Sequence, residues 1–212
     1  MKAVFRNLIN SVKNKMIGKQ SRKPSGIFGR MITKKMESQN IEFYKEILKE
    51  LEIANGNRIF EIGYGTGFGI NLIANNYPDC FVGGIDYSKL MYSTSIKRNQ
   101  KFIDNGNVEL SYGDLLTTKI NNRCFDKIFC INVIYFWSDL NNAFKKVYSM
   151  LNTEGIFCIY MKQEKELQEL KFAEDFHKYS IEKVESELRN VGFNSVTHKL
   201  NKGYYIKAIN RR

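Results

Sequence analysis

The part of the sequence best suited to holding a ligand is a run of glycines that directly follows an apolar segment. Residues 58–62 form a short apolar run typical of strands buried on both faces, and a helix is expected over about 69–76. Between them stand Gly63, Gly65 and Gly67, whose backbone can take positive φ and lets a ligand lie directly on the main chain. The unpaired N–H groups at the start of the helix suit an electronegative group.

The spacing of these glycines excludes two familiar nucleotide-binding loops. A dinucleotide loop would require a glycine where Phe68 stands, and a P-loop requires a lysine, which is absent between Arg58 and Lys89. The remaining pattern over residues 61–67, acidic-x-Gly-x-Gly-x-Gly, resembles the first motif of the class I S-adenosylmethionine (SAM)-dependent methyltransferases. A glycine-rich turn without a ligand is the alternative interpretation.

Segments of strand length alternate with helical patterns along most of the chain. Strands are expected near 58–62, 81–85, 107–111, 126–131, 155–161, 194–200 and 203–209, and helices near 1–20, 37–53, 69–76, 88–104, 139–151, 162–178 and 181–190. This alternation predicts an α/β fold with a doubly wound, mostly parallel sheet. The last two strands resemble the antiparallel hairpin that closes the seven-stranded, Rossmann-like methyltransferase sheet.

A polar side chain stands at or just after the end of each of the first four predicted strands. These are Glu61, Asp86, Asp114 and Asn132, which should line one crevice beyond the carboxyl ends of the strands. Glu61 could accept a hydrogen bond from the ammonium of SAM, directly or through water, and Asp86 could accept from both ribose hydroxyls. Asn132 would lie beside the methyl group. Singly, Asp86 and Asp114 could be ordinary strand-end or turn residues.

Further cofactor contacts are expected from the neighbours of these residues. The N–H groups of the glycine loop suit the SAM carboxylate, and Tyr87 and Met91 could pack on the adenine. The resemblance implies that Asp114 takes the adenine amine while the backbone N–H of Leu115 meets the ring. Tyr64 departs from the family pattern, in which small residues are common there. The predicted cofactor-binding residues are Glu61, Gly63, Tyr64, Gly65, Gly67, Asp86, Tyr87, Met91, Asp114, Leu115 and Asn132.

The methyl acceptor leaves a weaker trace in the sequence. Tyr135, Phe136 and Trp137 could form an aromatic wall for an apolar or planar acceptor, or pack under the next helix. His177 could meet the acceptor from above, and a surface role is the alternative. Because methyl transfer from a sulfonium mainly needs a positioned and desolvated nucleophile, no catalytic acid or base is assigned.

The charge of the chain is concentrated at its N-terminus. The 212 residues carry a net charge of +11, and residues 1–36 contain ten Lys or Arg and no Asp or Glu. We expect two parts, a basic helical arm or lid over 1–36 and a methyltransferase domain over 37–212. A loop is expected over 21–30. The helix over 1–20 has an apolar set at three- and four-residue steps, namely Phe5, Leu8, Ile9, Val12 and Met16. This helix could pack on the body, cover the substrate, attract acidic partners, lie on a membrane or act as a targeting peptide.

The four cysteines have no paired spacing, which predicts a reducing compartment without structural zinc, and no carboxylate cluster suggests another metal. No apolar run approaches about 18 residues and no secretory signal is recognisable, so a cytoplasmic location is expected. The preferred function is methyl transfer from SAM to a small molecule. The alternatives are an RNA or protein methyltransferase that holds an acidic macromolecule with the arm, and a non-catalytic SAM-binding or membrane-associated protein.

Overall fold

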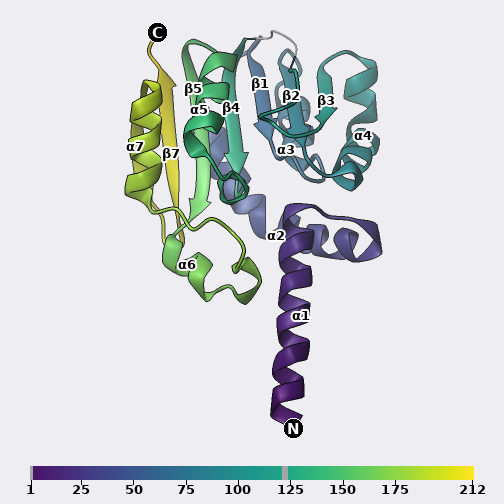
Figure 1. Cartoon of the computed structure of the whole chain (residues 1–212). Coiled ribbons are helices and arrows are strands. Elements are labelled where there is room, and N and C mark those ends of the chain that lie inside the picture. The colour runs from purple at the N-terminus through teal and green to yellow at the C-terminus, as the bar shows by residue number, and fades with distance from the viewer. Residues whose placement is uncertain (1, 121–123) are drawn as a thin grey trace.

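The computed structural model describes residues 2–120 and 124–212, and its centre is a seven-stranded sheet in the order β3-β2-β1-β4-β5-β7-β6 (Figure 1). The strands are β1 (Arg58–Ile62), β2 (Phe81–Asp86), β3 (Val108–Tyr112), β4 (Phe125–Ile131), β5 (Leu151–Lys162), β6 (Phe193–Lys199) and β7 (Gly203–Asn210). Strands β1 to β5 are parallel, whereas β7 is antiparallel to both β5 and β6. The predicted α/β fold with an antiparallel C-terminal hairpin is confirmed.

Helices cover both faces of this sheet. The helices in the described residues are α1 (Lys2–Arg22), which projects away from the sheet, α2 (Gly26–Glu50), α3 (Phe68–Asn76), α4 (Lys89–Asp104), α5 (Leu140–Met150), α6 (Glu164–Glu169) and α7 (Ile181–Val191), with short 3₁₀ turns η1 (Ile134–Phe136) and η2 (Lys171–Ala173). None of the helices in the described parts of the chain combines the length and apolarity needed to span a bilayer.

The alternation of side chains along β1 assigns each face its own core. Phe60 and Ile62 pack in a cluster with α5 and α7, whereas Ile59 packs in a second cluster with α2 and α3. Burying an aliphatic or aromatic side chain of this size contributes about 1.5–3 kcal/mol, so both layers stabilise the sheet. Because side chains alternate along a strand, Glu61 lies on the same face as Ile59, beneath α2 and α3.

The N-terminal helices meet in a tight bend. We call residues 21–25 the elbow; α1 ends inside it, and α2 begins at Gly26 rather than near residue 37 as expected. The expected loop over 21–30 is therefore shorter, because Gly29 serves close packing instead of a turn. A Cβ on Gly29 would lie 2.8 Å from the Gln20 side chain and 3.0 Å from the carbonyl carbon of Pro24. The expected boundary between residues 36 and 37 falls inside α2.

Helix α1 projects away from the sheet, with its N-terminal end far from the body (Figure 1). It contacts the body near its C-terminal end, where Gly18 packs so closely on η2 that a Cβ would overlap the carbonyl oxygen of Phe172. The side chains of Phe5 and Leu8 lie outside the described residues.

The charged segment after β5 is not the single surface helix that was expected over 162–178. It forms α6 and η2, separated at Leu170. The break allows both Leu167 and Ala173 to be buried against the core. Strand β5 also begins earlier than expected, at Leu151.

Candidate active site

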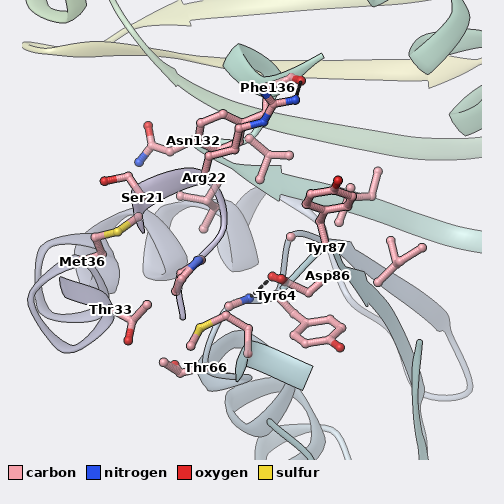
Figure 2. A pocket seen from close by; sticks show the side chains of 18 of the residues that line it. Ser21, Arg22, Thr33, Met36, Tyr64, Thr66, Asp86, Tyr87, Asn132 and Phe136 are labelled. Carbon is pink, nitrogen blue, oxygen red and sulfur yellow. Dashed lines mark hydrogen bonds between the residues drawn. The ribbon is translucent and has the colours of Figure 1, made fainter. Parts of the chain in front are cut away.

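A cavity of about 190 Å³ lies at the carboxyl ends of the parallel strands. One wall consists of the glycine loop and the segments that follow β2, β3 and β4, and the opposite wall consists of the elbow and α2 (Figure 2). This is the edge at which a doubly wound sheet binds its ligands.

The glycine loop presents bare backbone to the cavity. Gly63 and Gly65 both line it, with φ values of 74° and 53° that favour glycine. A Cβ on Gly63 would lie 2.5 Å from Val133 Cγ2, whereas a Cβ on Gly65 would meet no atom within 4 Å. The main chain at Gly65 therefore faces open space. Gly67 points elsewhere, because a Cβ there would overlap Ser95 Oγ on α4.

Asp86, at the end of β2, holds the loop in place. Its Oδ2 accepts a hydrogen bond from the Gly65 N–H at 2.8 Å, and its Oδ1 accepts one from the Ser88 N–H at 2.8 Å. Burial raises the pKa of Asp86 to about 6, although the two backbone hydrogen bonds oppose the shift. The carboxyl group is thus both a part of the cavity wall and an anchor for the glycine loop.

The wall beside Asp86 combines apolar and acidic groups. Met91 and Leu115 line the cavity and are buried, while Tyr87 lines it at the surface, beneath Lys23 Nζ, which lies 4.2 Å from its ring centre. Asp114 also lines the cavity, and its Oδ1 accepts a hydrogen bond from the Leu116 N–H at 2.8 Å. A flat apolar ligand with polar edges would fit between these side chains.

Asn132 follows β4 and adopts a left-handed backbone with φ of 58°, which is uncommon outside glycine. Its Nδ2 donates to Asn40 Oδ1 on α2 at 3.2 Å, and its Oδ1 accepts from the Tyr135 hydroxyl at 3.1 Å. The Asn132 side chain therefore connects the end of β4 to α2 at the cavity (Figure 2). Tyr135 itself is buried behind Asn132, and its hydroxyl also accepts from the Lys162 N–H.

The elbow is fixed over the cavity by contacts with two different strand ends. The Ser88 hydroxyl donates to the Pro24 carbonyl at 2.7 Å, and Ser88 is fully buried. On the other side, Arg22 Nη2 donates to the Phe136 carbonyl at 3.5 Å. Arg22, Asn132 and Phe136 lie together on this side of the cavity in Figure 2. The elbow thus bridges the β2 and β4 sides of the site.

A polar cluster links α2 to the glycine loop. Glu37 on α2 accepts a hydrogen bond from the Thr66 hydroxyl and forms an ion pair with Arg98 on α4 at 2.8 Å. Arg98 also donates to Thr66 Oγ1 at 2.9 Å. Burial alone would raise the pKa of Glu37, but the hydrogen bonds from Arg98 and Thr66 and the Arg98 charge lower it overall.

Glu61 and Tyr44 form a buried joint between β1 and α2. The Tyr44 hydroxyl donates to Glu61 Oε1 at 2.7 Å, while Oε2 has no hydrogen-bond partner among the described residues. Burial raises the pKa of Glu61 to about 8, although the Tyr44 hydrogen bond lowers it. Tyr44 lines the cavity but Glu61 does not, so Tyr44 stands between the Glu61 carboxyl and the ligand space.

The sequence matches a known family over most of its length. Residues 53–209 match the family described as Methyltransferase domain. The chain belongs to this methyltransferase family. The methyltransferase is 25% identical over 127 residues to YdaC of Bacillus subtilis, named as an uncharacterized methyltransferase, covering 60% of this chain and 68% of that protein. It is 28% identical over 156 residues to the phosphoethanolamine N-methyltransferase of Plasmodium falciparum, covering 71% of this chain and 57% of that protein.

Solved structures share the fold. Phosphoethanolamine N-methyltransferase 2 of Haemonchus contortus, solved with SAM, superposes with a TM-score of 0.70 at 16% identity and covers 81% of the methyltransferase and 53% of its own chain. YcgJ from Bacillus subtilis superposes with a TM-score of 0.67 at 14% identity and covers 81% and 99%. These similarities show the fold. The family match makes the protein a methyltransferase, and methyltransferases built on this sheet use SAM as their cofactor.

The cavity fits this cofactor chemically. The space beside Gly65 leaves room for the amino-acid end of SAM, although the N–H groups of Gly63 and Gly65 already donate to Ile85 and Asp86. The Asp86 carboxyl suits a ribose diol, and the buried Met91 and Leu115 suit an adenine face. Among residues 2–120 and 124–212, no three His, Cys, Asp or Glu side chains are grouped to hold a metal ion.

Most of the predicted cofactor residues come together at this cavity. Those that line it are Gly63, Tyr64, Gly65, Asp86, Tyr87, Met91, Asp114, Leu115 and Asn132. Glu61 and Gly67 do not reach it, the first because Tyr44 covers it and the second because it packs on α4. Of the predicted acceptor residues, Phe136 and Trp137 line the cavity, Tyr135 is buried behind it, and His177 is exposed and stacks on Tyr179 instead.

The predicted site residues did not include the residues of the roof. These are Ser21, Arg22, Pro24, Thr33, Met36, Glu37, Asn40 and Tyr44. Only a helical arm or lid over residues 1–36 was expected there, without a statement of which side chains would line the cavity.

Proposed function

We propose that the protein transfers the methyl group of SAM to a small-molecule acceptor that binds between the glycine loop and the elbow. The observation that carries this proposal is the bridged roof, in which Pro24 is hydrogen-bonded to Ser88 and Arg22 to Phe136. A roof over the cavity limits the access of water and positions a small nucleophile, whereas a folded RNA or protein would need an open groove.

When bound, SAM supplies an electrophilic methyl group on its sulfonium. The contribution of the chain itself is to hold and orient the cofactor and the acceptor. In this proposal the Gly63 and Gly65 backbone receives the amino-acid end, Asp86 accepts hydrogen bonds from the ribose, and Asp114 with Leu115 contacts the adenine edge. Asn132 lies between the β4 end and α2, where it can orient the acceptor. Glu61 would act on the cofactor only indirectly, through Tyr44.

The acceptor side of the cavity has its own chemical character. Arg22 is the one Lys or Arg among the described lining residues, and near it stand the neutral Asn40, Asn132, Phe136 and Trp137. A guanidinium has five N–H donors in a planar fork that matches carboxylate and phosphate groups. We therefore propose an acceptor that carries an anionic group. Relatives named phosphoethanolamine N-methyltransferase and trans-aconitate 2-methyltransferase are consistent with this class.

The N-terminal arm over residues 1–36 takes the role of a lid in this proposal, and residues 37–212 that of the methyltransferase domain. The elbow carries the polar contacts that close the site. The first turns of α2 continue the roof through Thr33 and Met36.

The test separates acceptors by size and uses the full chain. Purified protein is incubated with methyl-labelled SAM and with small metabolites, RNA or protein, each added alone. Phosphoethanolamine and trans-aconitate are the first single compounds to try. Label in the small-molecule fraction is expected. Label found only in RNA or protein, or none in the small-molecule fraction, would overturn the proposal in favour of a macromolecular acceptor or a non-catalytic role.

A further inference from the structure

The projecting part of α1 carries an exposed apolar stripe. Ile9, Val12 and Met16 follow one another at three- and four-residue steps, so they lie on one side of the helix, and all three are exposed. From Ile9 to Arg22, only Gly18 is buried. We propose that this stripe docks the protein on an anionic lipid surface.

An isolated helix of this kind gains little stability in water. Helix α1 has 21 residues, and only its C-terminal end packs on the body (Figure 1). Most helical stability in proteins comes from packing an apolar face, which here is uncovered. A second surface that buries Ile9, Val12 and Met16 would supply the missing stabilisation.

The charges around the stripe decide which surface that is. Lys13, Lys15 and Lys19 are exposed around it, with Lys19 one turn beyond Met16 on the same side of the helix, and no acidic residue occurs before Glu37. A second copy of α1 would bring lysines against lysines without a counter-charge, so self-association through this helix is disfavoured. An anionic surface attracts every charge on the helix.

The apolar stripe also favours a lipid partner over a nucleic acid. Phosphates would satisfy the lysines but would leave the aliphatic side chains in water, because RNA offers no aliphatic interior. At a bilayer the apolar side chains enter the boundary between headgroups and acyl chains, while lysines extend their charged ends toward anionic headgroups. Both features of α1 are used only in the lipid case.

Docking would bring the catalytic cavity close to the membrane. Met16 and the cavity-lining Arg22 are six residues apart on the same helix, about 9 Å along its axis. The elbow that roofs the cavity is thus the direct continuation of the docking helix. This inference concerns the arm alone and stands whether or not the acceptor is a small molecule.

The experiment measures co-sedimentation of the full-length protein with vesicles. Vesicles of phosphatidylcholine alone are compared with vesicles that contain phosphatidylglycerol. Binding to the anionic vesicles is expected to be at least about tenfold stronger, with a loss of about fivefold for each lysine of Lys13, Lys15 and Lys19 changed to Gln. Binding that ignores vesicle charge would overturn the proposal.

A matched pair of variants tests the apolar stripe. Val12 and Val196 are valines of similar exposure, 62% and 57%, on α1 and on β6. Val12→Glu should weaken vesicle binding by at least about tenfold, and Val196→Glu should leave it unchanged. Both should bind S-adenosylhomocysteine as the parent does, which shows that the body is folded. Equal vesicle binding by the two variants would overturn insertion of the stripe.

Other occupants have their own signatures. Absence of vesicle binding together with salt-dependent binding of an RNA oligonucleotide would overturn the lipid assignment in favour of nucleic acid. Absence of vesicle binding together with a concentration-dependent dimer that Val12→Glu abolishes would overturn it in favour of a second copy.

Discussion

The two walls of the catalytic cavity are built on different principles. The sheet wall is made of strand ends and a glycine loop, and its shape is fixed by backbone hydrogen bonds such as that from Gly65 to Asp86. The roof is made of the elbow and α2. Polar contacts such as Ser88 with Pro24 and Glu37 with Arg98 hold the elbow and the first half of α2, whereas the second half of α2 packs in the core through Tyr44 and Ile47.

The difference indicates which task each wall performs in the site. The sheet wall is part of the cooperative core, so its geometry should persist without ligand. The elbow and the first half of α2 can separate from the sheet wall by losing a small number of hydrogen bonds, each worth about 0.5–1.5 kcal/mol. A methyltransferase needs both properties, because the cofactor must be held in a fixed position and the acceptor must enter and leave.

The largest effect is expected at Glu61 and Tyr44, where the sheet wall and the roof meet. The raised pKa of Glu61 lets the folded protein keep this proton up to about pH 8, whereas the unfolded chain releases it near the ordinary glutamate pKa of 4.5. The folded state therefore binds more protons in this window, and its stability should fall as pH rises through it, on the order of 3–5 kcal/mol in total. Glu61→Gln, which cannot ionise, should flatten this decline in urea unfolding midpoints.

The surface variant Glu174→Gln is the control for this experiment and should keep the parent's dependence on pH. If Glu61→Gln and the parent lose stability equally between about pH 5 and pH 8, the joint is not the source of the decline. The walls would then be less firmly connected than the buried Tyr44 hydrogen bond suggests.

The next effect concerns the sheet wall alone. Asp86→Ala removes the proposed ribose acceptor and also the anchor of the Gly65 N–H. Affinity for S-adenosylhomocysteine, measured by calorimetry, should fall by about 10- to 100-fold, or about 1–3 kcal/mol. Asp79→Ala, on the exposed turn before β2, should have no effect. Unchanged affinity in the Asp86 variant would show that the ribose is held elsewhere.

The corresponding change in the roof should not alter the affinity for the cofactor. Arg22→Gln removes the cation that we assign to an anionic acceptor, so KM for that acceptor should rise about tenfold. The affinity for S-adenosylhomocysteine should stay within about twofold of the parent, since Arg22 contacts the Phe136 side of the cavity. Arg30→Gln, exposed on α2 and outside the cavity lining, is the control. A loss of cofactor affinity equal to the rise in KM would contradict the division between walls.

The same division explains what the sequence could predict. The residues of the sheet wall could be predicted because the sequence patterns that identify them are local. Once the strands are parallel, the residues at their carboxyl ends all fall at the same edge of the sheet. Asp86, Asp114 and Asn132 were placed correctly at the cavity for this reason. Glu61 was misjudged in its surroundings because strand position alone could not reveal that Tyr44 would cover it.

The contacts of the roof could not be predicted from the sequence, for the opposite reason. These contacts join residues far apart in the chain, such as Glu37 with Arg98 and Asn40 with Asn132, and no short sequence pattern predicts such pairs. A loop was expected over residues 21–30, although Gly29 lies inside α2 and permits close packing on the elbow. His177 was considered because of its chemistry, and the fold placed it at the surface.

The smallest effect is expected at the polar cluster that connects the two walls. Glu37→Gln removes the charge that pairs with Arg98 at the surface, and such pairs contribute only about 0.2–1 kcal/mol to stability. Glu187→Gln removes a comparable pair with Lys183 on α7 and should lower the unfolding free energy by a similar small amount. Only Glu37→Gln should weaken S-adenosylhomocysteine binding, by about two- to fivefold, because Glu37 also accepts from Thr66 within the glycine loop. Equal cofactor binding by the two variants would mean that the roof does not support the glycine loop, and the sheet wall would then act on its own.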